Sequence, residues 1–503
     1  MTPIEMFFRA ATIWPEAIAI EWQGQRLQYK QLLARVTAVA SALQQIESRP
    51  GSRVGICAFN DLDHLIAFLA TFAARKVWVP LYPRLGQTEL PTMVDFTEAS
   101  IVITHEGSRE LFESLDTRVV TLGAQGKESF AELESSGMGK RPEQHVPGLD
   151  SVHAIKFTGG TTGLPKGVMQ PVRAWNTNIV TQIHTWGMSG GDRTLIAAPM
   201  THGAGTYIMP TLASGGTLVI VDRQKPEQLI EVLAEQKIAT VFLSPTVIQL
   251  MADIPSVDAF SFPELRNLIY GAGPMQTQAV KKAQGIFGEC IATTYGQTEA
   301  PQIATALSAK DLAKPELRAS VGRETLLTRV AVMNEDGMLL PPGEIGEVVI
   351  RGDLVMTGYW RQPDKTAETL IEGWLHTGDL GTFNEVGCLL LKGRSKDVII
   401  SGGFNVYPGD VEKILTSHAD VSDCAVFGVP DDKWGEAVHA AVELHREVDA
   451  ESLIEHVKAS LGSVKAPKKI HVYESLPRNT YGKLQRQELV DAVASSAEGK
   501  GES

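Results

Sequence analysis

The residues best suited to chemistry form one short run of glycines and hydroxyl side chains followed by a lysine, within Phe-Thr-Gly-Gly-Thr-Thr-Gly-Leu-Pro-Lys-Gly-Val at 157–168. Glycines let backbone N–H groups approach an anion closely. The hydroxyl groups add further donors, and the lysine adds a positive charge. The run therefore predicts a polyphosphate-binding loop, whose candidate ligands are Thr158, Gly159, Gly160, Thr161, Thr162, Gly163 and Lys166.

This loop differs from the Walker loop of P-loop NTPases, in which the lysine follows a glycine and precedes a serine or threonine that holds magnesium. Here Pro165 precedes the lysine and Gly167 follows it, so a P-loop NTPase is a poor interpretation. An ordinary turn is the other alternative. Turn geometry alone does not explain three glycines, three hydroxyls and a lysine in so short a segment.

Four shorter clusters follow along the chain, and each could contact a nucleotide. The Tyr-Gly-Gln-Thr-Glu run at 295–299 offers a ring that can stack on a purine and a carboxylate suited to magnesium. Asp379 could accept hydrogen bonds from a ribose, and Arg394 could reach the ribose or a phosphate. The glycines at 402–403 would let a thin ligand pass close to the backbone, and Lys483 lies in a turn near the end of the chain. Taken singly, each cluster is more simply explained as a solvated turn.

The bulk composition excludes several classes of function. The chain has 503 residues and a formal net charge of -13, which argues against nucleic acid or anionic lipid as the main partner. No apolar run is long enough to cross a membrane, and the N-terminus lacks the pattern of a signal peptide. We therefore expect a cytoplasmic protein without an integral membrane segment. Four widely separated cysteines fit a reduced compartment as buried thiols: Cys57, Cys290, Cys388 and Cys424.

Strand and helix signals alternate through most of the chain, which predicts an α/β fold of layered, mostly parallel sheets. One helix is expected at 29–46, and the strands are expected at 53–59, 76–81, 101–104, 119–122, 152–157, 194–198, 217–221, 240–243 and 267–271. From about 325 to 393 the pattern becomes β-rich. We predict a large domain over 1–393, a hinge at 394–397 and a small mobile α+β domain over 398–503, with a disordered tail from about 495.

Joined in this order, the five clusters resemble the core motifs of the adenylate-forming superfamily, which comprises acyl- and aryl-CoA synthetases, luciferases and peptide-synthetase adenylation domains. The resemblance spans essentially the whole chain. It implies a ligase that first makes an acyl-adenylate and pyrophosphate from an acid and ATP, and then makes acyl-CoA and AMP. ATP, magnesium and coenzyme A are the implied cofactors. The family loop commonly has Ser where this chain has Gly159, which removes one hydroxyl but keeps the backbone N–H.

The resemblance also implies roles for individual residues. Lys483 would bridge the substrate carboxylate and the α-phosphate during adenylation. Glu299 would bind magnesium, and Thr298 would contact the α-phosphate. The residues implied around the adenine and the ribose are Gly271, Ala272, Gly273, Tyr295, Gly296, Gln297, Asp379 and Arg394.

The implied acid and CoA sites involve fewer residues. His202 would line the acyl pocket or gate the thiol tunnel, with Tyr207, Gly271 and Gly296 as further pocket residues. Lys396 matches the hinge position. The residues implied to line the pantetheine tunnel or contact CoA are Gly402, Gly403 and Trp434.

Within the superfamily, a stand-alone acyl-CoA synthetase fits best. The sequence offers no sign of a luciferin, and no carrier domain follows Lys483 as it would in a peptide synthetase. The expected partners are a small carboxylic acid, either a fatty acid or an aryl or arylpropenoic acid, and CoA; a homodimer stays open. The alternatives are a ligase that loads a separate carrier protein and a non-catalytic nucleotide or acyl sensor.

Overall fold

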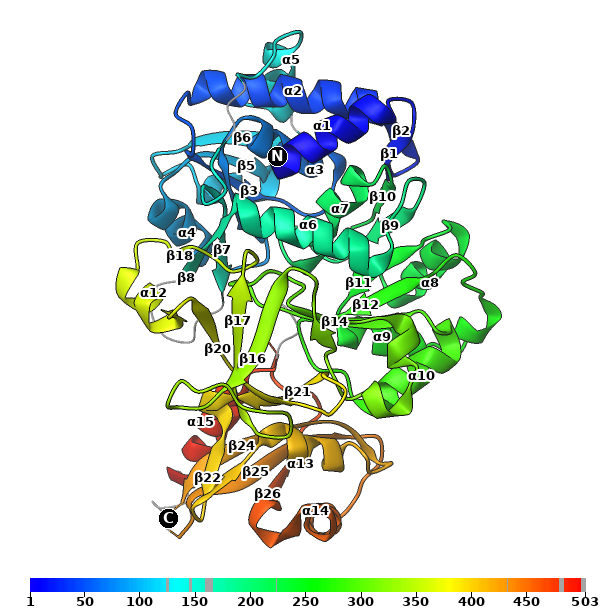
Figure 1. Cartoon of the computed structure of the whole chain (residues 1–503), viewed down its shortest axis with the longest axis vertical. Helices are drawn as coiled ribbons and strands as arrows, with labels where there is room; N and C mark the ends of the chain where they lie inside the picture. Colours follow the sequence, from blue (N-terminus) through cyan, green and yellow to red (C-terminus); the bar gives the residue numbers. More distant parts are fainter. Residues whose placement is uncertain are drawn as a thin grey trace. The chain divides into compact units, whose positions relative to one another are not determined.

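The structure, a computed structural model, describes residues 1–123, 126–143, 147–158, 166–222, 224–431, 433–478 and 484–498. The chain divides into two compact units, and Figure 1 labels their elements. The first unit comprises Met1–Pro274, Lys282–Val330 and Ile350–His376, and the second comprises Met275–Lys281, Ala331–Val349 and Thr377–Ser503.

A seven-stranded sheet of the first unit has the order β18-β8-β7-β4-β3-β5-β6. Strands β7, β4, β3, β5 and β6 are parallel, whereas β8 and β18 join the β7 edge as antiparallel strands. The strands are β3 (Arg53–Cys57), β4 (Val77–Leu81), β5 (Ala99–His105), β6 (Arg118–Leu122), β7 (Val152–Thr158), β8 (Lys166–Pro171) and β18 (Gly358–Tyr359).

A nine-stranded sheet of the same unit has the order β15-β14-β13-β12-β11-β9-β10-β1-β2 and is parallel from β13 to β1. Its strands are β1 (Ile18–Trp22), β2 (Gln25–Gln28), β9 (Arg193–Ile196), β10 (Thr217–Ile220), β11 (Thr240–Leu243), β12 (Asn267–Tyr270), β13 (Ile291–Tyr295), β14 (Thr305–Leu307) and β15 (Arg323–Glu324).

The helices from α1 to α12 are α1 (Pro3–Ile13), α2 (Tyr29–Ile46), α3 (Leu62–Ala73), α4 (Glu89–Thr97), α5 (Phe130–Gly137), α6 (Val172–Trp186), α7 (Ile208–Ala213), α8 (Pro226–Glu235), α9 (Pro245–Ala252), α10 (Thr277–Phe287), α11 (Ala309–Leu312) and α12 (Pro363–Thr369).

Local sequence explains why these elements form where they do. Every residue of β4, β11 and β12 is buried, as expected of parallel strands covered on both faces. Helix α3 begins at Asp61, whose carboxylate accepts the backbone N–H of His64 at 2.6 Å. One hydrophobic core includes side chains of both sheets, among them Trp78 and Ile269. In open α/β sheets of this kind, ligands bind at the carboxyl ends of the parallel strands. The segments that follow these strands are therefore where a functional site is expected.

The remaining strands form two smaller sheets, ordered β16-β17-β20-β19 with β21 beside β20, and β23-β22-β25-β24 with β26 beside β25. Their strands are β16 (Thr328–Met333), β17 (Gly346–Gly352), β19 (Leu370–Ile371), β20 (Trp374–Phe383), β21 (Leu389–Arg394), β22 (Ile399–Ser401), β23 (Phe404–Val406), β24 (Val421–Asp431), β25 (Gly435–Leu444) and β26 (Lys469–Val472). The last helices are α13 (Pro408–Leu415), α14 (Ala450–Lys465) and α15 (Arg486–Glu498).

The expected α/β fold with a C-terminal α+β region is confirmed. Helix α15 extends to Glu498, and residues 499–503 lie outside the described part. The disordered tail expected from about 495 stays a prediction. The domain boundary and hinge at 394–397 stay predictions. No helix among the described residues is long and apolar enough to cross a membrane.

Candidate active site

The two ends of the predicted phosphate loop are held side by side by a β-hairpin register. Thr158 ends β7 and Lys166 begins β8, and their Cα atoms are partners in the antiparallel pair. Residues 159–165 lie outside the described part of the chain, so the roles expected of the other loop residues stay predictions. The hairpin brings one hydroxyl and one ammonium to the same end of the sheet.

Tyr359 links the loop lysine to the expected magnesium ligand. The Lys166 ammonium lies 5.4 Å from the centroid of the Tyr359 ring, a cation–π distance. The Tyr359 hydroxyl donates a hydrogen bond to Glu299 Oε1 at 2.9 Å. Sequence reasoning missed this tyrosine. Gly358 before it has φ +142°, and a Cβ there would lie 2.6 Å from Thr366 Cγ2, so the position requires glycine.

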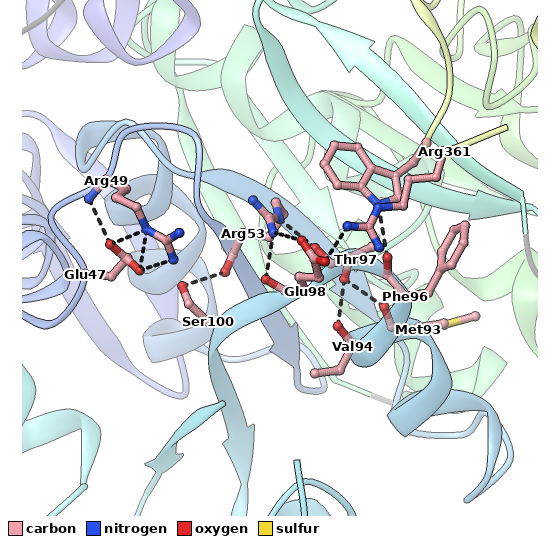
Figure 2. A network of polar contacts seen from close by, with 11 residues as sticks. Glu47, Arg49, Arg53, Met93, Val94, Phe96, Thr97, Glu98, Ser100 and Arg361 are labelled. Atoms are coloured by element: carbon pink, nitrogen blue, oxygen red, sulfur yellow. Dashed lines mark hydrogen bonds and ion pairs between the residues drawn. The ribbon is translucent and has the colours of Figure 1, made fainter. Parts of the chain in front are cut away.

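A polar network anchors the segment that follows Tyr359 (Figure 2). Trp360 Nε1 donates to the carbonyl of Phe96 at 3.0 Å, and Arg361 pairs with the Glu98 carboxylate. Arg53 bonds the carbonyl of Glu98 at 3.0 Å, and its guanidinium carbon lies 5.3 Å from the Trp360 ring centroid. These contacts fix the backbone beside Tyr359, and hence the position of its hydroxyl against Glu299.

The 295–299 cluster begins with Tyr295, the last residue of β13, and continues into the loop that follows this strand. Gln170 Nε2 donates to the carbonyl of Thr298 at 2.8 Å, and the carbonyl of Glu299 accepts the backbone N–H of Met356 at 2.8 Å. A Cβ at Gly296 would lie 2.7 Å from the backbone carbon of Gln302, so the close backbone approach requires glycine. Glu299 and Lys166 thus both contact Tyr359, and their assignment to one phosphate site stays a prediction.

The residues present fit a magnesium ion held mainly by the substrate. Among the residues that the structure describes, no three His, Cys, Asp or Glu side chains gather as a metal site. Magnesium is commonly bound by one or two carboxylates together with substrate phosphates and water. Glu299 supplies one such carboxylate beside the end of the phosphate loop, so it would hold the ion where the phosphates arrive.

The expected pocket residues gather around Phe242 and Gln302, which sequence reasoning missed. A Cβ at Gly203 would lie 2.8 Å from Phe242 Cε1, and one at Gly271 would lie 3.2 Å from Phe242 Cε2. Tyr207 stacks on Phe242 with centroids 5.5 Å apart, and its hydroxyl accepts a hydrogen bond from Gln302 Nε2 at 3.1 Å. Phe242 lies in β11 and is contacted by the segments after β9 and β12. It carried no sequence signal beyond its place in a strand.

His202 lies beside this group in an environment that keeps its ring neutral. Burial and the nearby Lys156 ammonium lower the pKa of His202 to about 3. Its Nδ1 lies 2.7 Å from the Thr201 hydroxyl, and its ring meets Tyr82 edge-on at 5.0 Å between centroids. A neutral imidazole at pH 7 suits a wall or gate better than a charge partner.

The 271–273 segment follows β12. Ala272 adopts a left-handed conformation with φ +64°, and Ala272 and Gly273 are exposed, whereas Gly271 is buried. An exposed backbone turn at the carboxyl end of a parallel strand suits contact with a flat ring. The adenine role expected for this segment stays a prediction.

In the second unit, β20 and β21 hold Asp379 and Arg394 opposite each other. Arg394 Nε lies 2.7 Å from Asp379 Oδ1, and Arg394 Nη1 donates to the carbonyl of Thr377 at 3.2 Å. Gly378 has φ +69°, and its N–H donates to Glu347 Oε1 at 2.8 Å. The two residues expected at the ribose therefore form an ion pair with each other, next to the turn at Gly378.

Of the two glycines expected at the pantetheine tunnel, Gly402 lies against Trp434. The Gly402 N–H donates to the carbonyl of Trp434 at 2.7 Å, and a Cβ at Gly402 would lie 3.1 Å from Trp434 Cε3. The ammonium groups of Lys433 and Lys468 each lie 4.9 Å from the Trp434 ring centroid. Aromatic and cationic groups thus meet beside an exposed glycine backbone. Lys396 is exposed in the turn after β21.

Lys483 lies outside the described residues, but the residues on either side of its segment are well held. Arg478 and Leu484 are antiparallel backbone partners, and Arg478 pairs with the Asp423 carboxylate. Arg486 Nη2 lies 2.6 Å from Glu412 Oε1, a carboxylate that is buried. The described residues that flank 479–483 are therefore tied to the same α+β fold.

Known proteins resemble the chain over nearly its whole length. The AMP-binding enzyme family matches residues 7–360, and the AMP-binding enzyme C-terminal domain matches residues 410–483. The chain is 32% identical to the medium/long-chain-fatty-acid–CoA ligase FadD8 of Mycobacterium tuberculosis, over 92% of this chain and 85% of that protein. It is 33% identical to a feruloyl-CoA synthase of an Amycolatopsis species, over 96% and 97%. ATP-bound MatB of Rhodopseudomonas palustris is a structural neighbour with a TM-score of 0.90 and 28% identity, over 98% and 99% of the two chains.

Proposed function

Since the chain belongs to the AMP-binding enzyme family and is an AMP-forming acyl-CoA synthetase, we propose that the residues described above carry its two half-reactions. The single observation that supports this most directly is the contact series from Lys166 through Tyr359 to Glu299. It joins the end of the phosphate loop to the expected magnesium ligand, two features that the sequence separates by more than a hundred residues.

In the first half-reaction, a carboxylate attacks the α-phosphorus of ATP, and pyrophosphate leaves. Two anions must approach each other, so the protein contributes mainly positioning and charge neutralisation. We assign Thr158 and Lys166 to the β- and γ-phosphates, together with the glycines and threonines between them. Glu299 would hold magnesium, which neutralises phosphate charge when bound. Lys483 would neutralise the carboxylate and the α-phosphate as they meet.

The ribose is assigned to the Asp379–Arg394 pair. An aspartate can accept from both ribose hydroxyls, and its pairing with Arg394 at 2.7 Å fixes its carboxylate before the nucleotide arrives. The adenine is assigned to Tyr295 and the 271–273 turn. Both assignments rest on the resemblance, and the ion pair between Asp379 and Arg394 supports the first of them.

In the second half-reaction, the CoA thiol attacks the acyl carbonyl, and AMP leaves. Gly402 and Gly403 would let the pantetheine arm pass beside the backbone. Trp434 with Lys433 and Lys468 offers an aromatic face and two ammonium groups, which suit the adenine and phosphates of CoA. A neutral His202 would gate the path of the CoA thiol, because an uncharged ring neither attracts nor repels a charged sulfur.

The acid is proposed as a fatty acid or an aryl or arylpropenoic acid, because the relatives' names span a medium- to long-chain fatty acid and a feruloyl group at nearly equal identity. Phe242 and Tyr207 are the aromatic residues that would meet its tail. Loading of a carrier protein is the second candidate, supported by the 30% identity to a fatty acid–[acyl-carrier-protein] ligase of Streptomyces coeruleorubidus.

The decisive experiment separates the half-reactions. Purified protein with ATP, magnesium, CoA and a panel of acids should release AMP and pyrophosphate; release of ADP and phosphate would contradict the mechanism. Lys483→Ala should abolish pyrophosphate release yet leave much of the thioester formation from a supplied acyl-adenylate. Lys458→Ala, at an exposed lysine paired with Glu455, is the matched control and should leave both steps unchanged. Equal loss of both steps in Lys483→Ala would reject the role assigned to Lys483.

A further inference from the structure

Lys156 is a buried cation for which the described part of the protein supplies no anion. It lies in β7, and its side chain is only 8% exposed. Burial is the sole cause that lowers its pKa, to about 8, and no carboxylate among the described residues forms an ion pair with it. Its ammonium lies 5.1 Å from the centroid of the Trp78 ring. At pH 7 the amine is still protonated in most molecules, and the face of an aromatic ring replaces only part of the hydration that burial removes.

A second buried lysine, directly before strand β4 of the same sheet, shows what a structural lysine looks like here. Lys76 is 3% exposed, and its ammonium donates to the carbonyls of Glu47 and Arg49. The Glu47 carboxylate also acts on it electrostatically. Lys76 thus has acceptors supplied by the fold, whereas Lys156 has an aromatic face and no acceptor among the described residues.

The residues around Lys156 place its ammonium next to the side chains expected to line the acid site. Its ammonium is close enough to His202 to lower the pKa of that imidazole, and His202 adjoins the pocket group around Phe242. Residues two apart in a strand share a face, so Lys156 and Thr158 lie on one face of β7, about 7 Å apart. Lys156 therefore lies two residues before Thr158, which we assign to phosphate, and its ammonium is near Trp78 and His202.

We propose that Lys156 is a specificity residue that binds a second carboxylate, carried by the tail of the acid that the enzyme activates. The inference rests on the proposed function, since it takes the space beside His202 as the acid site. A plain alkyl tail would leave the ammonium without a partner, at a cost in free energy. A tail carboxylate would instead form a charge-assisted hydrogen bond in a desolvated site. The reacting carboxylate remains with the adenylation lysine, and the second one selects the substrate.

The experiment compares matched acids rather than one activity. Pyrophosphate release is measured for straight-chain diacids from butanedioate to decanedioate and for the monoacids of equal length, with wild type, Lys156→Met and Lys156→Arg. In wild type, the best diacid should exceed its monoacid in kcat/KM. Lys156→Met should lower that ratio by about 10- to 100-fold, the range for a hydrogen bond to a charged group, and Lys156→Arg should retain most of it.

The controls separate this inference from its alternatives. Lys76→Met removes a buried ammonium at the start of the neighbouring strand β4 and should leave the diacid-to-monoacid ratio unchanged. An equal loss for both acids in Lys156→Met, or a raised KM for ATP at an unchanged ratio, would overturn the inference and assign Lys156 to packing or to the nucleotide. A wild type that prefers monoacids at every length would also overturn it. Failure to release pyrophosphate with any acid would instead reject the proposed function. If Lys156→Met does not fold, Lys156→Gln takes its place.

Discussion

Removal of the Tyr359 hydroxyl tests the link between the phosphate loop and the magnesium ligand. Tyr359→Phe deletes the 2.9 Å hydrogen bond to Glu299 Oε1 and keeps the ring that lies 5.4 Å from Lys166. Tyr359 is buried, so water replaces the lost donor poorly. A hydrogen bond to a charged group contributes about 1.5–3 kcal/mol net, which corresponds to a factor of about 10 to 150 in an equilibrium or rate constant.

We therefore expect Tyr359→Phe to lower kcat/KM for pyrophosphate release by about 10- to 100-fold, as is typical when a partner of a metal ligand is lost. The magnesium concentration for half-maximal rate should rise as well, because the Glu299 carboxylate is no longer oriented. The assay is pyrophosphate release at saturating ATP and acid over a magnesium titration. ATP binding without magnesium should change little, since the ring beneath Lys166 remains.

The matched control is Tyr29→Phe. Tyr29 is fully buried, and its hydroxyl donates to the carbonyl of Gly216 at 2.7 Å, so this change removes a buried tyrosine hydroxyl that touches no metal ligand. Tyr29→Phe should alter thermal stability and leave the magnesium dependence intact. If Tyr359→Phe has the same magnesium dependence and the same kcat/KM as wild type, the reasoning from the Lys166–Tyr359–Glu299 contacts is refuted.

Two further predictions concern stability. Burial lowers the pKa of His153 to about 3 from an ordinary 6.5, and its ring stacks on Phe72 with centroids 3.8 Å apart. Because the unfolded chain binds the proton more readily, this histidine lowers the free energy of unfolding as pH falls below about 6.5. Between pH 7 and pH 5, the free energy of chemical unfolding of His153→Phe should therefore fall by about 2 kcal/mol less than that of wild type. An equal loss in both proteins would contradict the assignment. Arg486→Met leaves the buried Glu412 carboxylate without its 2.6 Å partner and should destabilise the C-terminal fold by about 3–5 kcal/mol, measured as faster hydrogen exchange in α13 and β24. Adding Glu412→Leu should recover part of that loss, and no recovery would mean that the arginine acts by packing alone.

The sequence was a good guide wherever a feature depends on neighbouring residues. Helix α2 spans 29–46 as predicted, because apolar residues recur along it at helical spacing. The regular part of helix α14 ends where Gly462 adopts φ +80°, a backbone conformation that glycine adopts readily. The relation between Thr158 and Lys166 also follows from their short separation, since one hairpin register pairs them.

The sequence was a poor guide to residues whose role depends on a distant partner. Tyr359, Phe242 and Gln302 carry no signature of their own, and each matters because of what the fold brings against it. Lys156 was part of a segment interpreted as apolar, 152–157, and nothing in the local pattern distinguishes it from a solvated lysine. Its 8% exposure and its place beside Trp78 come from β4 and β7 meeting in one sheet.

What the sequence determined by itself is the kind of reaction, because the residues that bind phosphate, magnesium and ribose occur as short motifs with fixed local spacing. The tertiary structure decided how those motifs are joined and what surrounds them. It tied Glu299 to Tyr359 across 60 positions, enclosed Phe242 within the expected acid site, and left Lys156 buried with no described carboxylate beside it. The physical reason is that binding a charged ligand depends on single groups that a motif can carry, whereas pocket shape and desolvation depend on contacts between segments that only folding brings together.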